Sequence, residues 1–263
     1  MIVVVICLII AAIFMQKTKN EVDEYVEGDT VYEQMVDMAI DSSKKDIEKS
    51  VEEVDSFEEA DATEDNLTGL KTSYERLSVD FEKLKSINPD IVAWIYSPDT
   101  VINYPVVQTK DNSYYLTHLM DGTVNKNGCL FIECKNKVPF MDDNTIIYGH
   151  NMASGKMFAE LLNYRSQDYY DSHKFIYLIT EEVTYKMELF TSFTTDSGSD
   201  AYTISLGYKN NFASWIRKMA ENTDFKTKMK INTNDRIVTL STCSYSRKNA
   251  RYVVMGRLVE LED

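Results

Sequence analysis

Residues 235–261, DRIVTLSTCSYSRKNARYVVMGRLVEL, contain two apolar runs on either side of a polar segment. The first run, 237–242, and the second, which begins at Arg251, are rich in Val, Ile and Leu and have the length of strands. The polar segment 244–250 then forms the loop between them. This stretch therefore predicts two strands, with the thiol of Cys243 where the first strand ends.

Short apolar runs of the same kind recur through the preceding residues, and several alternate apolar with polar side chains. Eight or so such strands predict a mostly β fold, either an antiparallel barrel or a sandwich, and we favour a barrel with peripheral helices. A helix is expected to end at Asn88-Pro89, and two more helical pieces interrupt the strands. The other predicted strands lie within 91–96, 100–108, 128–133, 144–149, 174–180 and 184–193, and the helices within 67–84, 157–164 and 211–220.

The first fifteen residues, MIVVVICLIIAAIFM, are uncharged. As a helix they would span about 22 Å, against about 30 Å for a bilayer core. They fit the apolar region of a signal peptide or a membrane anchor whose first residues precede this start. Lys17 and Lys19 would by themselves favour keeping the following chain inside the cell. We favour an uncleaved anchor over residues 1–16.

The charge of the chain is concentrated in one segment. The formal net charge is −14, and residues 21–65 hold 18 Asp and Glu against three Lys, whereas residues 67–263 are nearly neutral. Such an acidic segment buries too little apolar surface to fold alone, so residues 17–66 are predicted to form a solvated stalk, partly helical or disordered. The overall charge also argues against nucleic-acid binding. One folded domain is expected over 67–263.

Four Cys in a chain of 263 residues exclude a disulfide-stapled miniprotein. Cys7 lies in the apolar N-terminus, and Cys129 and Cys134 are five apart, so a strand would point them to opposite faces. We interpret Cys7 as a small hydrophobic residue and Cys129 and Cys134 as packing residues, and no spacing of Cys and His indicates a metal site. Cys243 differs because Arg251 stands one short loop away and could stabilise a thiolate or an oxyanion.

A cysteine nucleophile needs an acid/base partner, and the chain has only three histidines. His150 directly follows the predicted strand 144–148 and Gly149, so it lies at a strand exit, as Cys243 does. His118 and His173 fit exposed loop positions. The spacing by itself does not bring His150 to Cys243, and a cysteine packed at a barrel rim would show the same pattern.

These residues also carry a resemblance to a known family. The string TLSTC at 239–243, with Arg251 eight residues later and IIYGHNM at 146–152, resembles the sortases, cysteine transpeptidases of Gram-positive cell surfaces. Residues 88–122, MFAELLNY at 157–164 and DYYDSHKFIYL at 168–178 resemble class B sortases in particular. The similarity covers about residues 67–263.

The resemblance implies an eight-stranded sortase barrel with N-terminal helices and a helix in the insertion before the catalytic strand. It implies that Cys243 is the nucleophile, His150 the general acid/base and Arg251 the residue that stabilises the oxyanion, with Arg247 as a rival cation. It further implies substrate-binding roles for Asn112, Leu116, Ser241 and Tyr202.

By the same resemblance, the substrates are secreted surface proteins with a sorting motif of the Asn-Pro-x-Thr-Asn or Ser/Pro-Pro-x-Thr-Gly kind. The motif would be cleaved after threonine through a thioester, and the protein transferred to an amine of peptidoglycan or its lipid-linked precursor. No cofactor or metal is expected. The expected location is the cell membrane, by a single-pass N-terminal anchor with the catalytic domain outside.

Two other functions compete with this one. A hydrolytic cysteine peptidase would use the same three side chains but pass the acyl group to water. A stalked β-barrel surface binding module would carry Cys243 as an inert residue.

Overall fold

The computed structural model describes residues 2–40 and 77–261, except 139, 245 and 247. Its helices and 3-10 turns are α1 (Ile2–Ala39), α2 (Phe81–Ile87), η4 (Tyr114–Leu116), η5 (Phe158–Arg165), α3 (Gln167–Ser172), η6 (Asp200–Tyr202) and α4 (Lys209–Ala220). Its strands are β1 (Ile91–Tyr96), β2 (Asn103–Val107), β3 (Leu130–Ile132), β4 (Asn144–Tyr148), β5 (Phe175–Ile179), β6 (Thr184–Asp196), β7 (Ile237–Cys243) and β8 (Ala250–Glu260).

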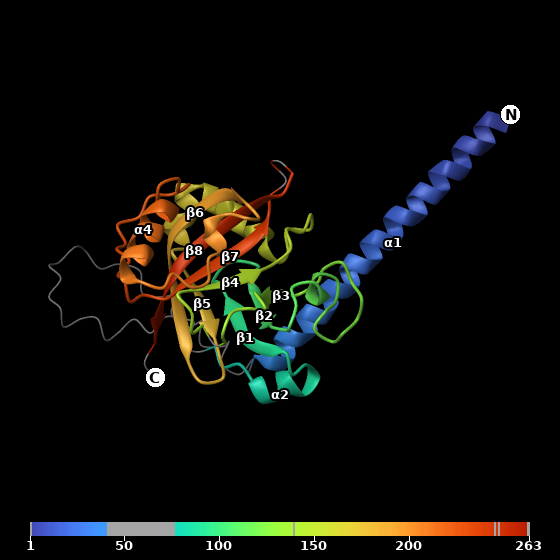
Figure 1. Cartoon of the computed structure of the whole chain (residues 1–263). Coiled ribbons are helices and arrows are strands. Elements are labelled where there is room, and N and C mark those ends of the chain that lie inside the picture. The colour runs from blue at the N-terminus through green and yellow to red at the C-terminus, as the bar shows by residue number, and fades with distance from the viewer. Residues whose placement is uncertain (1, 41–76, 139, 245, 247, 262–263) are drawn as a thin grey trace, which may run out of the picture.

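The eight strands in this part of the chain close into one barrel, in the order β1-β2-β3-β4-β7-β8-β6-β5, with β5 paired back to β1 (Figure 1). Neighbouring strands are antiparallel except for β2 with β3 and β4 with β7, which are parallel. The predicted barrel with N-terminal helices and a helix in the insertion is confirmed. Because parallel strands end at the same edge of a sheet, the residues after β4 and β7 lie side by side.

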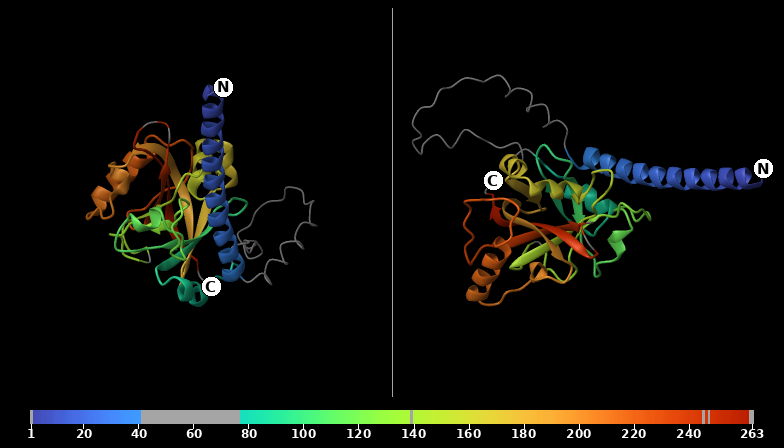
Figure 2. Two further views of the ribbon diagram at one scale, coloured as in Figure 1. Left: turned by 90° about the vertical axis from the view of Figure 1, so that its right-hand side faces the viewer. Right: turned by 90° about the horizontal axis from the view of Figure 1, so that it is seen from above.

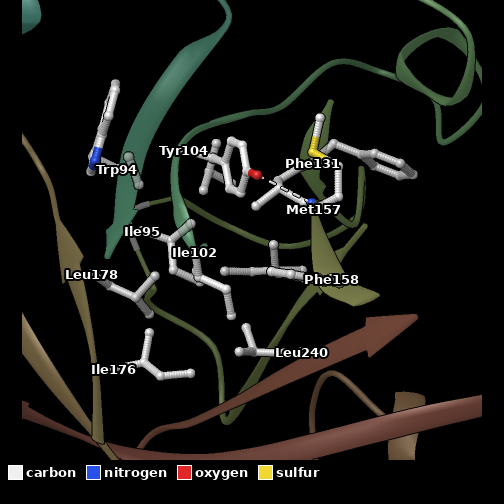
Figure 3. Close-up of a cluster of buried hydrophobic side chains, with 14 of the residues drawn as sticks. Trp94, Ile95, Ile102, Tyr104, Phe131, Met157, Phe158, Ile176, Leu178 and Leu240 are labelled. Atoms are coloured by element: carbon white, nitrogen blue, oxygen red, sulfur yellow. Dashed lines mark hydrogen bonds between the residues drawn. The ribbon is translucent and has the colours of Figure 1, made fainter. Parts of the chain in front are cut away.

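Apolar side chains from many strands fill the barrel (Figure 3). Burying each large side chain contributes about 1.5–3 kcal/mol, so this interior is the main source of stability. Phe158 also points inward from the start of η5 and is fully buried. Other fully buried members of the cluster are Trp94, Ile95, Ile102, Ile176, Leu178 and Leu240.

A second apolar cluster lies beneath α4, on the outside of the barrel. Phe212, Trp215 and Met219 of α4 are all buried in this cluster. The indole N–H of Trp215 donates to the carbonyl of Asp200 at 2.8 Å. The helix of the insertion thereby fixes η6, which carries Tyr202.

Of the helix expected over 67–84, residues 67–76 lie outside the described residues, and the prediction is wrong for residues 77–80. These residues are not helical, because Val79 forms an isolated β-bridge with Ile40 of the N-terminal segment. The described helix α2 begins after Asp80, whose side chain accepts a hydrogen bond from Lys83 N as an N-cap. It ends at Asn88, as Asn88-Pro89 predicts.

The two halves of α1 have different surroundings (Figures 1 and 2). The N-terminal half extends beyond the barrel, and Ile10 and Phe14 are exposed. The C-terminal half lies against the barrel, where Tyr32, Met35 and Ala39 are buried. Composition alone gave no sign of this contact. The boundary expected at residue 67 falls outside the described residues, so the division of the chain into segments stays a prediction.

The predicted single-pass anchor over residues 1–16, and with it the predicted location at the cell membrane, is wrong. Among the described residues, no helix is both long enough and apolar enough to cross a bilayer. The uncharged part of α1 stops after about 22 Å, against about 30 Å for a bilayer core. Lys17, Lys19 and the acidic residues from Glu21 onward follow in the same helix.

Candidate active site

The parallel strands β4 and β7 end together at one rim of the barrel. Beyond β4, the N–H of Gly149 donates to the carbonyl of Ser241 at 3.0 Å. The side-chain amide of Asn151 donates to the carbonyl of Cys243 at 2.8 Å. The residues immediately before and after His150 are therefore both hydrogen-bonded to the end of β7.

Tight packing requires the glycine before His150. A Cβ atom at Gly149 would lie 2.4 Å from Leu130 Cδ2 and 2.6 Å from Phe158 Cδ2. Phe158 is anchored in the barrel interior (Figure 3). Its N–H donates to the carbonyl of His150 at 2.9 Å. The backbone of His150 is thus tied to the hydrophobic core.

Cys243 and Arg251 face each other across the antiparallel pair β7–β8. Directly opposite residues point to the same face of a sheet, with Cβ atoms about 4.5–5.5 Å apart. The pairing continues beyond the strand, because Ser244 N donates to the carbonyl of Ala250 at 3.0 Å. Regular backbone pairing therefore sets the side chains of Cys243 and Arg251 next to each other on one face, and Nη1 of Arg251 donates to the carbonyl of Ala250 at 3.1 Å. Arg247, the rival cation, lies outside the described residues.

The thiol, the imidazole and the guanidinium line one pocket of about 260 Å³. All four residues predicted to bind substrate line the same pocket, so the structure brings every predicted site residue together. Its lining consists of Asn112, Leu116, Phe131, Tyr148, Gly149, His150, Ser197, Tyr202, Ser241, Thr242, Cys243 and Arg251.

A backbone carbonyl orients the imidazole of His150. Its Nε2 atom lies 2.8 Å from the carbonyl oxygen of Leu116. A carbonyl oxygen can only accept a hydrogen bond, so Nε2 carries the proton in this contact. Nδ1 is then the nitrogen left to exchange a proton with a reacting group.

Tyr202 and Ser241 form one wall of the pocket. Their hydroxyl oxygens are 2.9 Å apart, and the ring of Tyr148 stacks on that of Tyr202 with centroids 6.1 Å apart. Burial raises the pKa of Tyr202, although the hydrogen bond with Ser241 and the charge of Arg251 act in the opposite direction. This wall therefore offers neutral hydroxyl groups to a bound peptide.

The position of Tyr202 depends on a buried amide that the sequence did not single out. The Nδ2 atom of Asn144 donates to the carbonyls of Ala201 and Thr203, each at 3.0 Å. Its Oδ1 atom accepts from the hydroxyl of Thr239 at 2.8 Å. Asn144, the first residue of β4, thus joins β4 and β7 to the residues on either side of Tyr202.

Glu133 accepts hydrogen bonds from two other residues that line the pocket. Its Oε2 atom accepts from Asn112 Nδ2 at 2.7 Å and from the hydroxyl of Tyr148 at 3.1 Å. Burial opposes ionisation of Glu133, but the hydrogen bonds from Asn112, Cys134 and Tyr148 outweigh it, and the net effect lowers its pKa. No sequence signal pointed to Glu133, whereas Tyr148 directly precedes the Gly-His pair and could have been found.

The other histidines lie away from the pocket. His118 stacks on Tyr114 with ring centroids 4.0 Å apart, and His173 stacks on Tyr169 at 4.2 Å. Each ring is only partly exposed, and neither lines the pocket.

The cysteines outside the pocket differ from Cys243 in their surroundings. Cys129 is buried, and burial raises its pKa to about 12, so the thiol stays protonated at neutral pH. Burial and the neighbouring Glu133 also raise the pKa of Cys134. Within the described part of the chain, no group of three or more His, Cys, Asp or Glu residues could hold a metal ion.

Comparisons with known proteins agree with this geometry. The family described as the Sortase domain matches residues 95–259. Sortase B of Listeria monocytogenes is 35% identical over 180 residues, which make up 67% of this chain and 72% of that protein.

Solved structures of sortase B have the same fold. The Staphylococcus aureus sortase B–substrate complex is 29% identical, with a TM-score of 0.66, over 69% of this chain and 85% of that chain. A crystal structure of sortase B complexed with triglycine gives the same identity and TM-score, over 69% of this chain and 86% of that chain.

Proposed function

Because the chain belongs to the sortase family and is a cysteine transpeptidase of the sortase B kind, we propose that it cleaves a sorting motif after threonine and transfers the acyl group to a peptidoglycan amine. The motif is of the Asn-Pro-x-Thr-Asn or Ser/Pro-Pro-x-Thr-Gly kind. One observation carries the proposal: Cys243 faces Arg251 across β7–β8, and His150 lines the same pocket.

In the first step, the thiolate of Cys243 attacks the threonine carbonyl of the motif. An unperturbed thiol has a pKa of about 8.5 and is mostly protonated at pH 7. The positive charge of Arg251 opposes the negative charge that develops on the carbonyl oxygen. Removing one such oxyanion contact typically costs about 10²–10³ in rate.

His150 carries the proton in this scheme. With Nε2–H held by the Leu116 carbonyl, Nδ1 takes the proton and gives it to the departing amine as the C–N bond breaks. The products of this half-reaction are a Cys243 thioester and the free C-terminal fragment of the substrate.

An incoming amine resolves the thioester in the second half-reaction. Its nitrogen attacks the thioester carbonyl, the C–S bond breaks, and the proton that the nitrogen loses returns through His150 to the thiol. Transfer rather than hydrolysis requires that the amine is held next to the thioester. The solved sortase B structures with a substrate and with triglycine support this scheme, because triglycine carries a terminal amine.

Four residues that line the pocket take the substrate-binding roles in this proposal. Asn112, Leu116, Ser241 and Tyr202 bind the motif, and the catalytic unit corresponds to residues 67–263. The partners are secreted surface proteins that bear the motif and an amine of peptidoglycan or its lipid-linked precursor. The three catalytic side chains carry every proton and charge in these steps, so we propose no cofactor.

The experiment that tests this proposal is a panel of fluorogenic peptides over both motif classes, incubated with the full chain and with triglycine or diaminopimelate. We expect cleavage after threonine and an amide product whose yield rises with amine concentration, and no cleavage by Cys243→Ala. Free acid as the sole product at every amine concentration would identify a hydrolytic peptidase. No cleavage, with Cys243 alkylated no faster than a model thiol, would identify a binding module.

A further inference from the structure

The C-terminal half of α1 contacts the long connection between β2 and β3 (Figures 1 and 2). The carbonyl of Glu24 accepts from Asn125 Nδ2 at 2.8 Å, and the carbonyl of Tyr25 accepts from Asn127 Nδ2 at 3.2 Å. The carboxylate of Glu24 also forms an ion pair with Lys126, at 2.9 Å. Three successive residues of the connection are therefore fastened to one helix.

Tyr32, two turns further along α1, forms the most buried contact of this interface. Its side chain is only 4% exposed. Its hydroxyl donates to the carbonyl of Gly128 and lies 3.1 Å from Cys129 Sγ. Burial raises the pKa of Tyr32 well above its usual value, so the hydroxyl remains a donor at any physiological pH.

Gly128 directly contacts the groups that hold the imidazole of His150. A Cβ atom at this position would lie 2.5 Å from the carbonyl oxygen of Tyr115, 2.9 Å from that of Leu116 and 3.1 Å from His150 Cδ2. Its φ of +55° also favours glycine. The backbone that Tyr32 binds is thus packed against both the histidine ring and the carbonyl that accepts from it.

Tyr32 reaches the backbone of His150 by a second route. Its ring packs edge-on against Tyr104, with centroids 5.5 Å apart. The hydroxyl of Tyr104 accepts from Met157 N at 3.2 Å (Figure 3). The next residue, Phe158, donates its N–H to the His150 carbonyl at 2.9 Å.

We propose that Tyr32 of α1 is a positioning residue for His150, which it orients through Gly128 and the Leu116 carbonyl on one side and through Tyr104 and Met157 on the other. The inference rests on the proposed function, in which His150 transfers the proton. Tyr32 does not line the pocket that contains Cys243 and His150. Its loss is therefore expected to slow proton transfer without weakening peptide binding.

The test compares Tyr32→Phe with Tyr170→Phe in the full chain. Tyr170 is a matched control because it is also 4% exposed, and its hydroxyl lies 2.8 Å from Thr227 Oγ1, away from His150. We expect Tyr32→Phe to lower kcat roughly 10- to 100-fold with KM nearly unchanged, because small misplacements of a reacting group have such costs. Equal kcat values in the two variants would overturn the inference.

A spectroscopic measurement separates positioning from a general loss of stability. In protein with ¹⁵N-labelled histidine, the Nε2–H signal of His150 reports its hydrogen bond to Leu116. We expect this signal to shift in Tyr32→Phe and to stay in place in Tyr170→Phe. An unshifted signal in Tyr32→Phe would overturn the inference.

If Tyr32→Phe does not fold, variants of the ion pair between Lys126 and Glu24 are used in its place. Lys126→Glu is expected to lower kcat at least threefold, and adding Glu24→Lys is expected to restore it. Wild-type kcat in Lys126→Glu would overturn the inference.

Wild-type activity in His150→Ala would instead overturn the proposed function. An inactive His150→Ala together with wild-type kcat in Tyr32→Phe would overturn only the role of Tyr32.

Discussion

The two sides of the pocket are built in different ways. On one side, Cys243 and Arg251 occupy opposite positions of the β7–β8 ladder, and backbone hydrogen bonds set their separation. On the other side, the ring of His150 depends on the Leu116 carbonyl, which belongs to the connection between β2 and β3. That connection is in turn held by α1, through the hydroxyl of Tyr32 and the backbone carbonyl of Glu24.

This difference separates chemistry from positioning. Side-chain substitutions in a ladder leave the backbone register in place, so changes at Cys243 or Arg251 should remove a chemical group without moving its neighbours. Substitutions at the contacts between α1 and the connection should leave the catalytic groups present but alter where the imidazole points. Variants on the two sides of the pocket should therefore differ in how much activity they lose.

Removing the imidazole should have the largest effect. We expect His150→Ala to lower kcat by up to about 10⁴-fold, the upper range for general acid–base catalysis. His118→Ala and His173→Ala are matched controls, because both rings stack on tyrosines outside the pocket, and they should stay within about twofold of wild type. Steady-state turnover of a motif peptide measures all three, and a large loss in either control would contradict the assignment.

Changing the cation on the ladder side should cost somewhat less. Arg251→Lys keeps the charge but loses the planar fork that can hold two oxygens, so we expect a loss of about 10²-fold in kcat/KM. Arg257→Lys, on the same strand, is the control, because Arg257 pairs with Glu188 at 2.8 Å instead. Wild-type kcat/KM in Arg251→Lys would mean that Arg251 is not the cation of the reaction.

The tyrosine–serine wall should affect binding rather than chemistry. Tyr202→Phe and Ser241→Ala each remove one partner of the same hydroxyl contact, and a net hydrogen bond is worth about 0.5–1.5 kcal/mol. We expect each variant to raise KM about 2- to 10-fold, and the double variant to be no worse than the single ones. Fully additive effects on KM would show that the two hydroxyls act independently.

Glu133 should give the smallest effect, visible in stability against pH. Its pKa is lower in the folded than in the unfolded chain, so its stabilisation is present above the unfolded value of about 4.3 and is lost as pH falls through the folded value. We therefore expect Tm to be lower in Glu133→Gln than in wild type at pH 6, and this difference to shrink below about pH 4. A difference that is constant from pH 6 to pH 3 would contradict this role.

Local patterns in the sequence were enough to predict the strands and the end of α2. A short apolar run defines a strand wherever it pairs, and the predicted run IVAWIY coincides with β1 (Ile91–Tyr96). The position of Cys243 at a strand exit and of Arg251 at the next strand entry followed from the same patterns. Their direct opposition needed the hairpin register, which local patterns do not contain.

The long-range parts of the site required information beyond local pattern. His150 lies near Cys243 because β4 pairs in parallel with β7, a segment about ninety residues later in the chain. The spacing of residues along the sequence does not indicate this pairing. The resemblance to sortases supplied that link. No sequence pattern indicated a role for Glu133 or Tyr32, because each is a single polar side chain whose partners lie elsewhere in the chain.

The central claim is that the sulfur of Cys243 forms the covalent intermediate at this pocket, and intact-mass measurement tests it most directly. We expect that incubation with a motif peptide increases the mass of the protein. The increase should equal the mass of the acyl group that ends at the threonine of the motif. This mass should map to Cys243 and disappear when triglycine is added, with the amide appearing in step. Amide formation with no adduct at Cys243, or an adduct that triglycine leaves in place, would contradict the account.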